Sequence, residues 1–231
     1  MILLIAAAIA AAAPAPAAQC PDVVTPEAFV CRALEASNGG KSDVAATAFE
    51  QAALATADND PAKARMLAAA GNMWIAAGQP GKAALVLDRA LVGTGLQAEQ
   101  RGEALLDRAR AAEAQNDLKT ARAKLNEAAA TISEDPFYWY FSAALAIREQ
   151  DKTTAQAAIG RALSLAPSDP TILFEAGHVA QFAGDEAKAR EYWTRAAADP
   201  RGPVGKAARD ALALLPVPLT VKAPPAATPV P

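Results

Sequence analysis

The sequence is poor in the residues that metal binding and catalysis use most. His178 is the only histidine, and Cys20 and Cys31 are the only cysteines, in a chain of 231 residues. One histidine and two cysteines do not complete the four-ligand set of a structural zinc site. The sequence also has no glycine-rich phosphate loop and no nucleophile motif, and its serines and threonines lack a base partner. We therefore expect no enzyme activity, no cofactor and no metal.

Positive charge is not in excess either. The chain has 22 lysines and arginines against 25 aspartates and glutamates, which gives a net charge of −3. A protein that binds nucleic acid needs a basic stripe to neutralise phosphates. We therefore expect no nucleic-acid partner.

Long apolar runs are confined to residues 1–18, MILLIAAAIAAAAPAPAA. This stretch is typical of a secretory signal peptide, with Ala15–Ala17 as the cleavage signal, and it predicts a periplasmic or secreted protein. It has no basic n-region, since the first basic residue is Arg32. The alternative is an uncleaved anchor in the inner membrane, but the run is short for a span and is interrupted by Pro14 and Pro16. We expect no membrane span in the mature chain.

The two cysteines, Cys20 and Cys31, are candidates for a disulfide. An exported chain enters an oxidising compartment, where such a pair forms a bridge. The bond would tie the extension 19–25 to the first predicted helix. A lipid anchor on Cys20 is disfavoured because Gln19 stands where a small residue is needed.

Two consecutive segments of 34 residues, which begin at Pro136 and Pro170, share one pattern. Each follows an aspartate, and each contains a helical run, a short polar break and a second helical run. An aspartate before a proline is a typical helix start, because the carboxylate caps the backbone and proline fits the first helical position. A fixed period of this length with two helices indicates a helix–turn–helix solenoid.

The same register continues backwards to units that begin at Gly102, Ala64 and Pro26. The two earliest steps are 38 residues long, so each carries an insertion of about one helical turn. Alanine occupies unit positions 20 and 27 throughout, where a large side chain would force the two helices of a unit apart. An alanine-rich helical bundle is the alternative, but a bundle needs no fixed spacing. The alanines are Ala45, Ala52, Ala83, Ala90, Ala121, Ala128, Ala155, Ala162, Ala189 and Ala196.

This pattern resembles the tetratricopeptide repeats, which place a bulky residue at unit position 4, a small one at 8 and a large apolar one at 24. In the last unit these are Leu173, Gly177 and Trp193. The resemblance implies an all-α, right-handed α-α solenoid of five units plus a C-terminal capping helix. The predicted segments are a signal peptide (1–18), an N-terminal extension (19–25), the solenoid (26–215) and a proline-rich disordered tail (216–231).

In that family the first helices of the units line a concave groove that takes peptides. The chain departs from the family's carboxylate clamp, because only Asn72 matches the clamp in residue type. The resemblance therefore implies a protein or peptide segment with apolar anchors as the ligand, and not a free carboxylate tail. The candidate groove residues are Glu103, Arg110, Phe137, Tyr140, Phe141, Phe174 and His178.

The aromatic stretch Phe137–Phe141 allows two interpretations on sequence alone. It lines the groove, or it packs between neighbouring repeats. With no catalytic constellation in the chain, function must come from the surface. We expect a scaffold for protein–protein interaction in envelope assembly or secretion. The alternatives are a structural self-association module and a non-catalytic regulatory subunit of an envelope complex.

Overall fold

The computed structural model describes residues 20–198, 200 and 202–216. The predicted signal peptide and residues 217–231 of the predicted tail lie outside the described residues. Within them the chain forms eleven α-helices and no strand, and no helix is long and apolar enough to cross a membrane. The helices are α1 (Pro26–Asn38), α2 (Ser42–Ala55), α3 (Pro61–Ala76), α4 (Pro80–Val92), α5 (Ala98–Ala114), α6 (Leu118–Ile132), α7 (Pro136–Arg148), α8 (Lys152–Leu165), α9 (Pro170–Ala183), α10 (Glu186–Ala196) and α11 (Pro203–Leu214).

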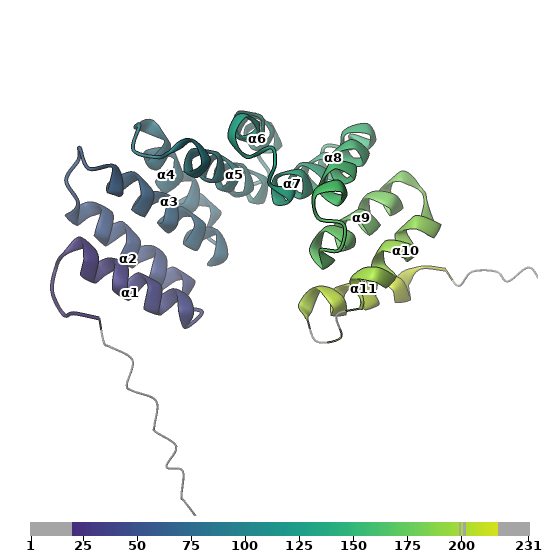
Figure 1. The fold of residues 1–231 in the computed structure, drawn as a ribbon, viewed down its shortest axis with the longest axis horizontal. Helices are drawn as coiled ribbons and strands as arrows, with labels where there is room; N and C mark the ends of the chain where they lie inside the picture. Colours follow the sequence, from purple (N-terminus) through teal and green to yellow (C-terminus); the bar gives the residue numbers. More distant parts are fainter. Residues whose placement is uncertain (1–19, 199, 201, 217–231) are drawn as a thin grey trace, which may run out of the picture.

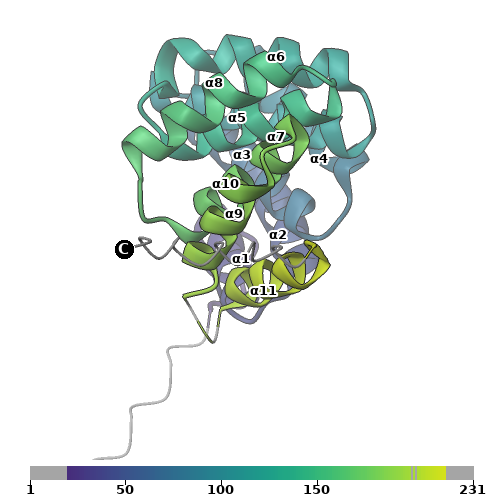
Figure 2. The same ribbon diagram turned by 90° about the vertical axis from the view of Figure 1, so that its right-hand side faces the viewer.

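The helices form five consecutive pairs that stack in an arch, with α1 at one end and α11 at the other (Figure 1). The first helices α3, α5 and α7 lie on the inner side of the arch, and the second helices α4, α6 and α8 lie on the outer side. Figure 2 faces the C-terminal end, where α11 contacts α9 and α10. Ala208 of α11 and the following Leu215 are buried in one cluster with Trp193, so α11 covers the last apolar face. The predicted all-α solenoid with its capping helix is confirmed.

Four of the five first helices begin at a capping residue followed by a proline. The side chains of Thr25, Asp60, Asp135 and Asp169 each accept a hydrogen bond from a backbone N–H in the first turn. Each cap is followed by a proline at the start of the helix. Proline has no N–H to leave unsatisfied there, so the two residues together fix where each first helix starts.

The turn inside each unit contains one residue with positive φ. These residues are Gly40, Gly78, Asn116, Gln150 and Gly184, with φ between 61° and 88°. The left-handed conformation ends the first helix and reverses the chain within a few residues. All five lie at the breaks that the sequence predicts. Gln150 is the unexpected member, because a side chain with a Cβ is strained in this region.

The predicted insertions extend helices and one loop. In the second unit α3 begins at Pro61, three residues ahead of the repeat register. In the third unit α5 begins at Ala98, and the loop before it carries Leu96, which is buried in the core of the second unit. The extra residues therefore enlarge connections without disturbing the helix pairs.

The ten repeat alanines form the tightest part of the core. All ten have no exposed surface, which confirms that unit positions 20 and 27 lie where helices cross. In the second and fifth units the glycine at position 8 packs against the large side chain at position 24. A Cβ on Gly71 would lie 2.4 Å from Leu87, and a Cβ on Gly177 would lie 2.2 Å from Trp193. Glycine is therefore required because the bulky position-24 side chain lies directly over it.

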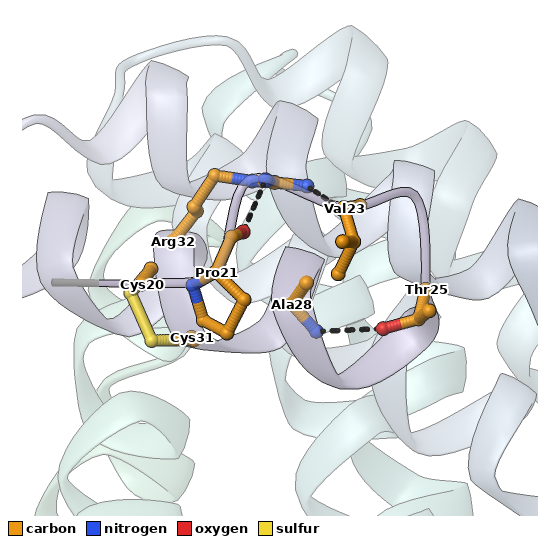
Figure 3. The surroundings of a disulfide bond; sticks show 7 residues. All are labelled: Cys20, Pro21, Val23, Thr25, Ala28, Cys31 and Arg32. Atoms are coloured by element: carbon orange, nitrogen blue, oxygen red, sulfur yellow. Dashed lines mark hydrogen bonds between the residues drawn. A yellow bond between two sulfur atoms is a disulfide. The ribbon is translucent and has the colours of Figure 1, made fainter.

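The N-terminal extension is fastened to α1 by three contacts, which Figure 3 shows. Cys20 and Cys31 form a disulfide. The Arg32 guanidinium donates hydrogen bonds to the carbonyl oxygens of Pro21 (3.0 Å) and Val23 (3.1 Å). The disulfide and the two hydrogen bonds thus hold the segment 20–23 against α1, the helix that carries Cys31 and Arg32.

Candidate functional site

The inner side of the arch contains a hollow of about 410 Å³ between α3, α5 and the start of α7. Its lining carries both signs of charge, with Arg65 and Arg110 facing Glu103, Asp107 and Asp135. Three of the predicted groove residues line it, namely Glu103, Arg110 and Phe137. The hollow therefore lies among the first helices of the second, third and fourth units, on the inner side of the arch.

Asp107 organises the floor of this hollow. It accepts hydrogen bonds from the Asn72 side-chain amide and from the Arg110 guanidinium, both at 2.8 Å. Arg110 also lies over the Phe137 ring, 5.5 Å from its centroid, in cation–π geometry. Asn72, the one residue that matches the carboxylate clamp in type, thus has its donor engaged by Asp107.

The acidic side of the hollow carries a perturbed carboxyl group. Partial burial raises the pKa of Glu103 above its ordinary value, and the nearby carboxylates of Glu99 and Asp107 raise the pKa further. These carboxylates repel one another. A cationic group that enters the hollow would be stabilised because its positive charge relieves that repulsion.

A second, aromatic part of the inner face joins α7 to α9. Phe137 and Tyr140 stack with their ring centroids 5.1 Å apart, and Phe174 meets His178 edge to face at 4.5 Å. Burial raises the pKa of Tyr140 above its usual range, and the Glu175 carboxylate on α9 adds to the rise. Helices α7 and α9 contact each other, and Tyr140 packs against the core cluster that contains Ile172 and Ala176 of α9. The aromatic part adjoins the charged hollow through Phe137.

The aromatic stretch of α7 divides between groove and core, which corrects one predicted groove residue. Phe141 is only 7% exposed and belongs to the core between α5, α6 and α7, together with Tyr138. Phe137 is 36% exposed and Tyr140 is half-buried. Residues three apart share a helix face, so 138 and 141 point to the core while 137 and 140 point to the inner face. Trp139 is half-buried and donates a hydrogen bond to the Ser133 carbonyl oxygen at 2.7 Å.

His178 contacts two residues, Glu175 and Trp193, and the sequence analysis predicted neither contact. Its Nδ1 is 3.5 Å from a carboxylate oxygen of Glu175, and its ring meets Trp193 edge to face at 5.5 Å. Glu175 was not among the predicted site residues. The signal for it was a lone acid in the otherwise apolar run of α9, PTILFEAGHV.

The outer side carries a surface that the sequence analysis missed. A hollow of about 950 Å³ lies between α2 and α4, with Trp74 of α3 at its base. Its rim includes Leu54, Leu85 and Val92, whose exposed fractions are 78%, 69% and 88%. Large apolar side chains this exposed and this close together mark an interaction surface. Leu85 and Val92 are seven residues apart, a helical spacing that was readable in the sequence.

No protein-family model matches the chain, and no curated protein matches it. Solved structures do match its fold. PilW, described as a widely conserved type IV pilus biogenesis factor, is 19% identical with a TM-score of 0.66, over 79% of this chain and 81% of PilW. PilF of Pseudomonas aeruginosa is 14% identical with a TM-score of 0.64, over 82% and 83% of the two chains. YrrB, a tetratricopeptide repeat protein with an unusual peptide-binding site, is 16% identical with a TM-score of 0.55, over 79% and 91%.

These likenesses define the class of structure. The chain has the tetratricopeptide repeat fold, as the 34-residue period and the repeat alanines predict. Sequence identity below 20% in all three comparisons means that they describe the fold alone.

Proposed function

We propose that this chain is a non-catalytic scaffold that binds a segment of a partner protein along its inner face. The observations that carry the proposal are the charged hollow on the inner face, which Phe137 lines, and the aromatic pairs of α7 and α9. Rings that are partly exposed and held by neighbours supply contact area at low entropic cost. The charges beside them would set the register of a bound segment and so give specificity.

The setting we propose is envelope assembly or secretion. The apolar leader 1–18 supports export, with the mature chain beginning near Ala18. The Cys20–Cys31 disulfide supports an oxidising compartment. PilW is described as a pilus biogenesis factor and YrrB as having a peptide-binding site, and both descriptions are compatible with this role.

A matched pair of variants tests the proposal. Phe137→Ala removes an exposed ring from the inner face, and Leu85→Ala removes an exposed apolar side chain from the outer face. The probe is a random peptide library displayed on phage, selected against the purified folded chain. We expect Phe137→Ala to weaken binding of the selected peptides at least tenfold, about 1.4 kcal/mol, and Leu85→Ala to leave it unchanged. The proposal is wrong if Leu85→Ala weakens peptide binding while Phe137→Ala does not. It is also wrong if both variants bind the selected peptides as tightly as the parent chain.

The outer hollow favours a second candidate function, which is self-association. Its exposed leucines and valine would be covered in a dimer of this chain. Size-exclusion chromatography with light scattering distinguishes the two functions. A dimer that Leu85→Lys converts to a monomer supports self-association, whereas a monomeric parent chain excludes it.

A further inference from the structure

The inner face holds one carboxylate that the packing of the repeats does not explain. Glu175 lies in α9 beside His178, and its side chain is only 9% exposed. The residue lies among the buried side chains of α9 and is one of three polar residues in the part of the chain described that are buried at all. Burying a carboxylate is costly unless hydrogen bonds or an opposite charge compensate it.

Glu175 lacks that compensation. Among the described residues it accepts no hydrogen bond, and its one ion-pair partner there is His178, whose Nδ1 is 3.5 Å away. That contact is long for a hydrogen bond, and it is an ion pair only when the imidazole is protonated. Arg110, the arginine of the charged hollow that stacks on Phe137, is bound to Asp107.

The carboxylate nevertheless reaches the surface. No side-chain oxygen or nitrogen in the described part of the chain is both fully buried and without a hydrogen-bond partner. The oxygens of Glu175 make no hydrogen bond, so they must retain some accessible surface. Most of the side chain is covered, and the charged end lies beside the His178 ring.

We propose that Glu175 is the base of a subsite for a basic side chain, an arginine of the bound partner segment. This inference rests on the proposed function and names what the groove selects. A guanidinium brings several N–H donors in one plane, which satisfies both carboxylate oxygens at once. It also stacks on aromatic faces, and the His178 ring beside the carboxylate meets the Phe174 ring edge to face at 4.5 Å. An apolar or acidic side chain would leave the carboxylate unpaired.

Nuclear magnetic resonance tests the subsite without knowledge of the partner. His178 is the only histidine of the chain, so its ring signals are an unambiguous reporter beside Glu175. The probe is N-acetyl-arginine methylamide, and the matched probe is N-acetyl-citrulline methylamide, which replaces the guanidinium by a neutral urea of the same shape. We expect the arginine probe to shift the His178 signals saturably, with a dissociation constant of about 1–10 mM, and the citrulline probe to bind at least tenfold more weakly.

Two variants complete the test. Glu175→Gln keeps the shape and removes the charge, so we expect the saturable shift with arginine to disappear. Glu186→Gln removes an exposed charge from the neighbouring helix α10 and should leave the shift unchanged. Equal binding of the two probes to the parent chain, or unchanged arginine binding to Glu175→Gln, would overturn the proposal.

The outcomes also separate this inference from the proposed function. If Phe137→Ala abolishes peptide binding but arginine and citrulline bind alike, the groove is correct and the subsite is wrong. If arginine binds at Glu175 but Phe137→Ala leaves the affinity for the selected peptides unchanged, the subsite exists and the proposed groove is wrong.

Discussion

Replacing Gly177 by alanine should destabilise the last repeat through a single methyl group. The new Cβ would lie 2.2 Å from Nε1 of Trp193 and within 2.6 Å of two further indole atoms. Trp193 is 1% exposed and donates a hydrogen bond from Nε1 to the Phe174 carbonyl oxygen at 2.9 Å. The indole is enclosed by its neighbours. The added methyl group can therefore fit only if the indole shifts, which strains its packing and its hydrogen bond.

The magnitude follows from three contributions. Overpacking a core costs about 1–3 kcal/mol, and loss of the indole hydrogen bond costs about 1 kcal/mol more. Alanine gains about 1 kcal/mol over glycine in a helix interior, which offsets the hydrogen bond. We therefore expect Gly177→Ala to lower the free energy of unfolding by about 1–3 kcal/mol.

Gly160 of α8 provides the matched control. A Cβ there would meet nothing within 4 Å, so Gly160→Ala should stabilise the chain by about 0.5–1 kcal/mol through helix propensity alone. Guanidinium unfolding followed by circular dichroism measures both variants, and hydrogen exchange locates the loss in α9 and α10. The combination of Gly177→Ala with Trp193→Leu should cost less than the two single changes added together, because the clash is removed. Equal stabilisation by Gly177→Ala and Gly160→Ala would refute the packing argument.

Two further predictions concern export and helix capping. Envelope-extracted protein should have the mass of a chain that begins near Ala18 and contains the Cys20–Cys31 disulfide; closure of an 11-residue separation should add about 3 kcal/mol to stability, and two free thiols would contradict it. The Thr154 hydroxyl, which donates to Asp151 at 2.6 Å, lowers the pKa of that carboxyl below 3.8. The cap therefore stabilises α8 at neutral pH and is lost as the pH falls from 3.8 through the lowered value, so Asp151→Ala should reduce the acid sensitivity of unfolding.

The architecture was accessible from local signals in the sequence. Asp135 and Asp169 before prolines start two helices, since cap and proline act within one turn of the chain. The glycines at the breaks reverse the chain because they adopt positive φ without strain. The fixed spacing of fully buried alanines then sets which helices cross. Each of these signals depends on residues close in the sequence or on a regular repeat. Such features can be recognised in the sequence without knowledge of the tertiary structure.

The division of side chains between groove and core needed the tertiary structure. Tyr140 and Phe141 are adjacent aromatic residues, yet one lines the inner face and the other is buried against α5 and α6. The exposure of Leu85 and the isolation of the Glu175 carboxylate likewise depend on which helices lie over them and how closely. Sequence period fixes the angle at which a side chain leaves its helix, whereas burial depends on the tilt and distance of the neighbouring helices. These are set by the packing of all the repeats together.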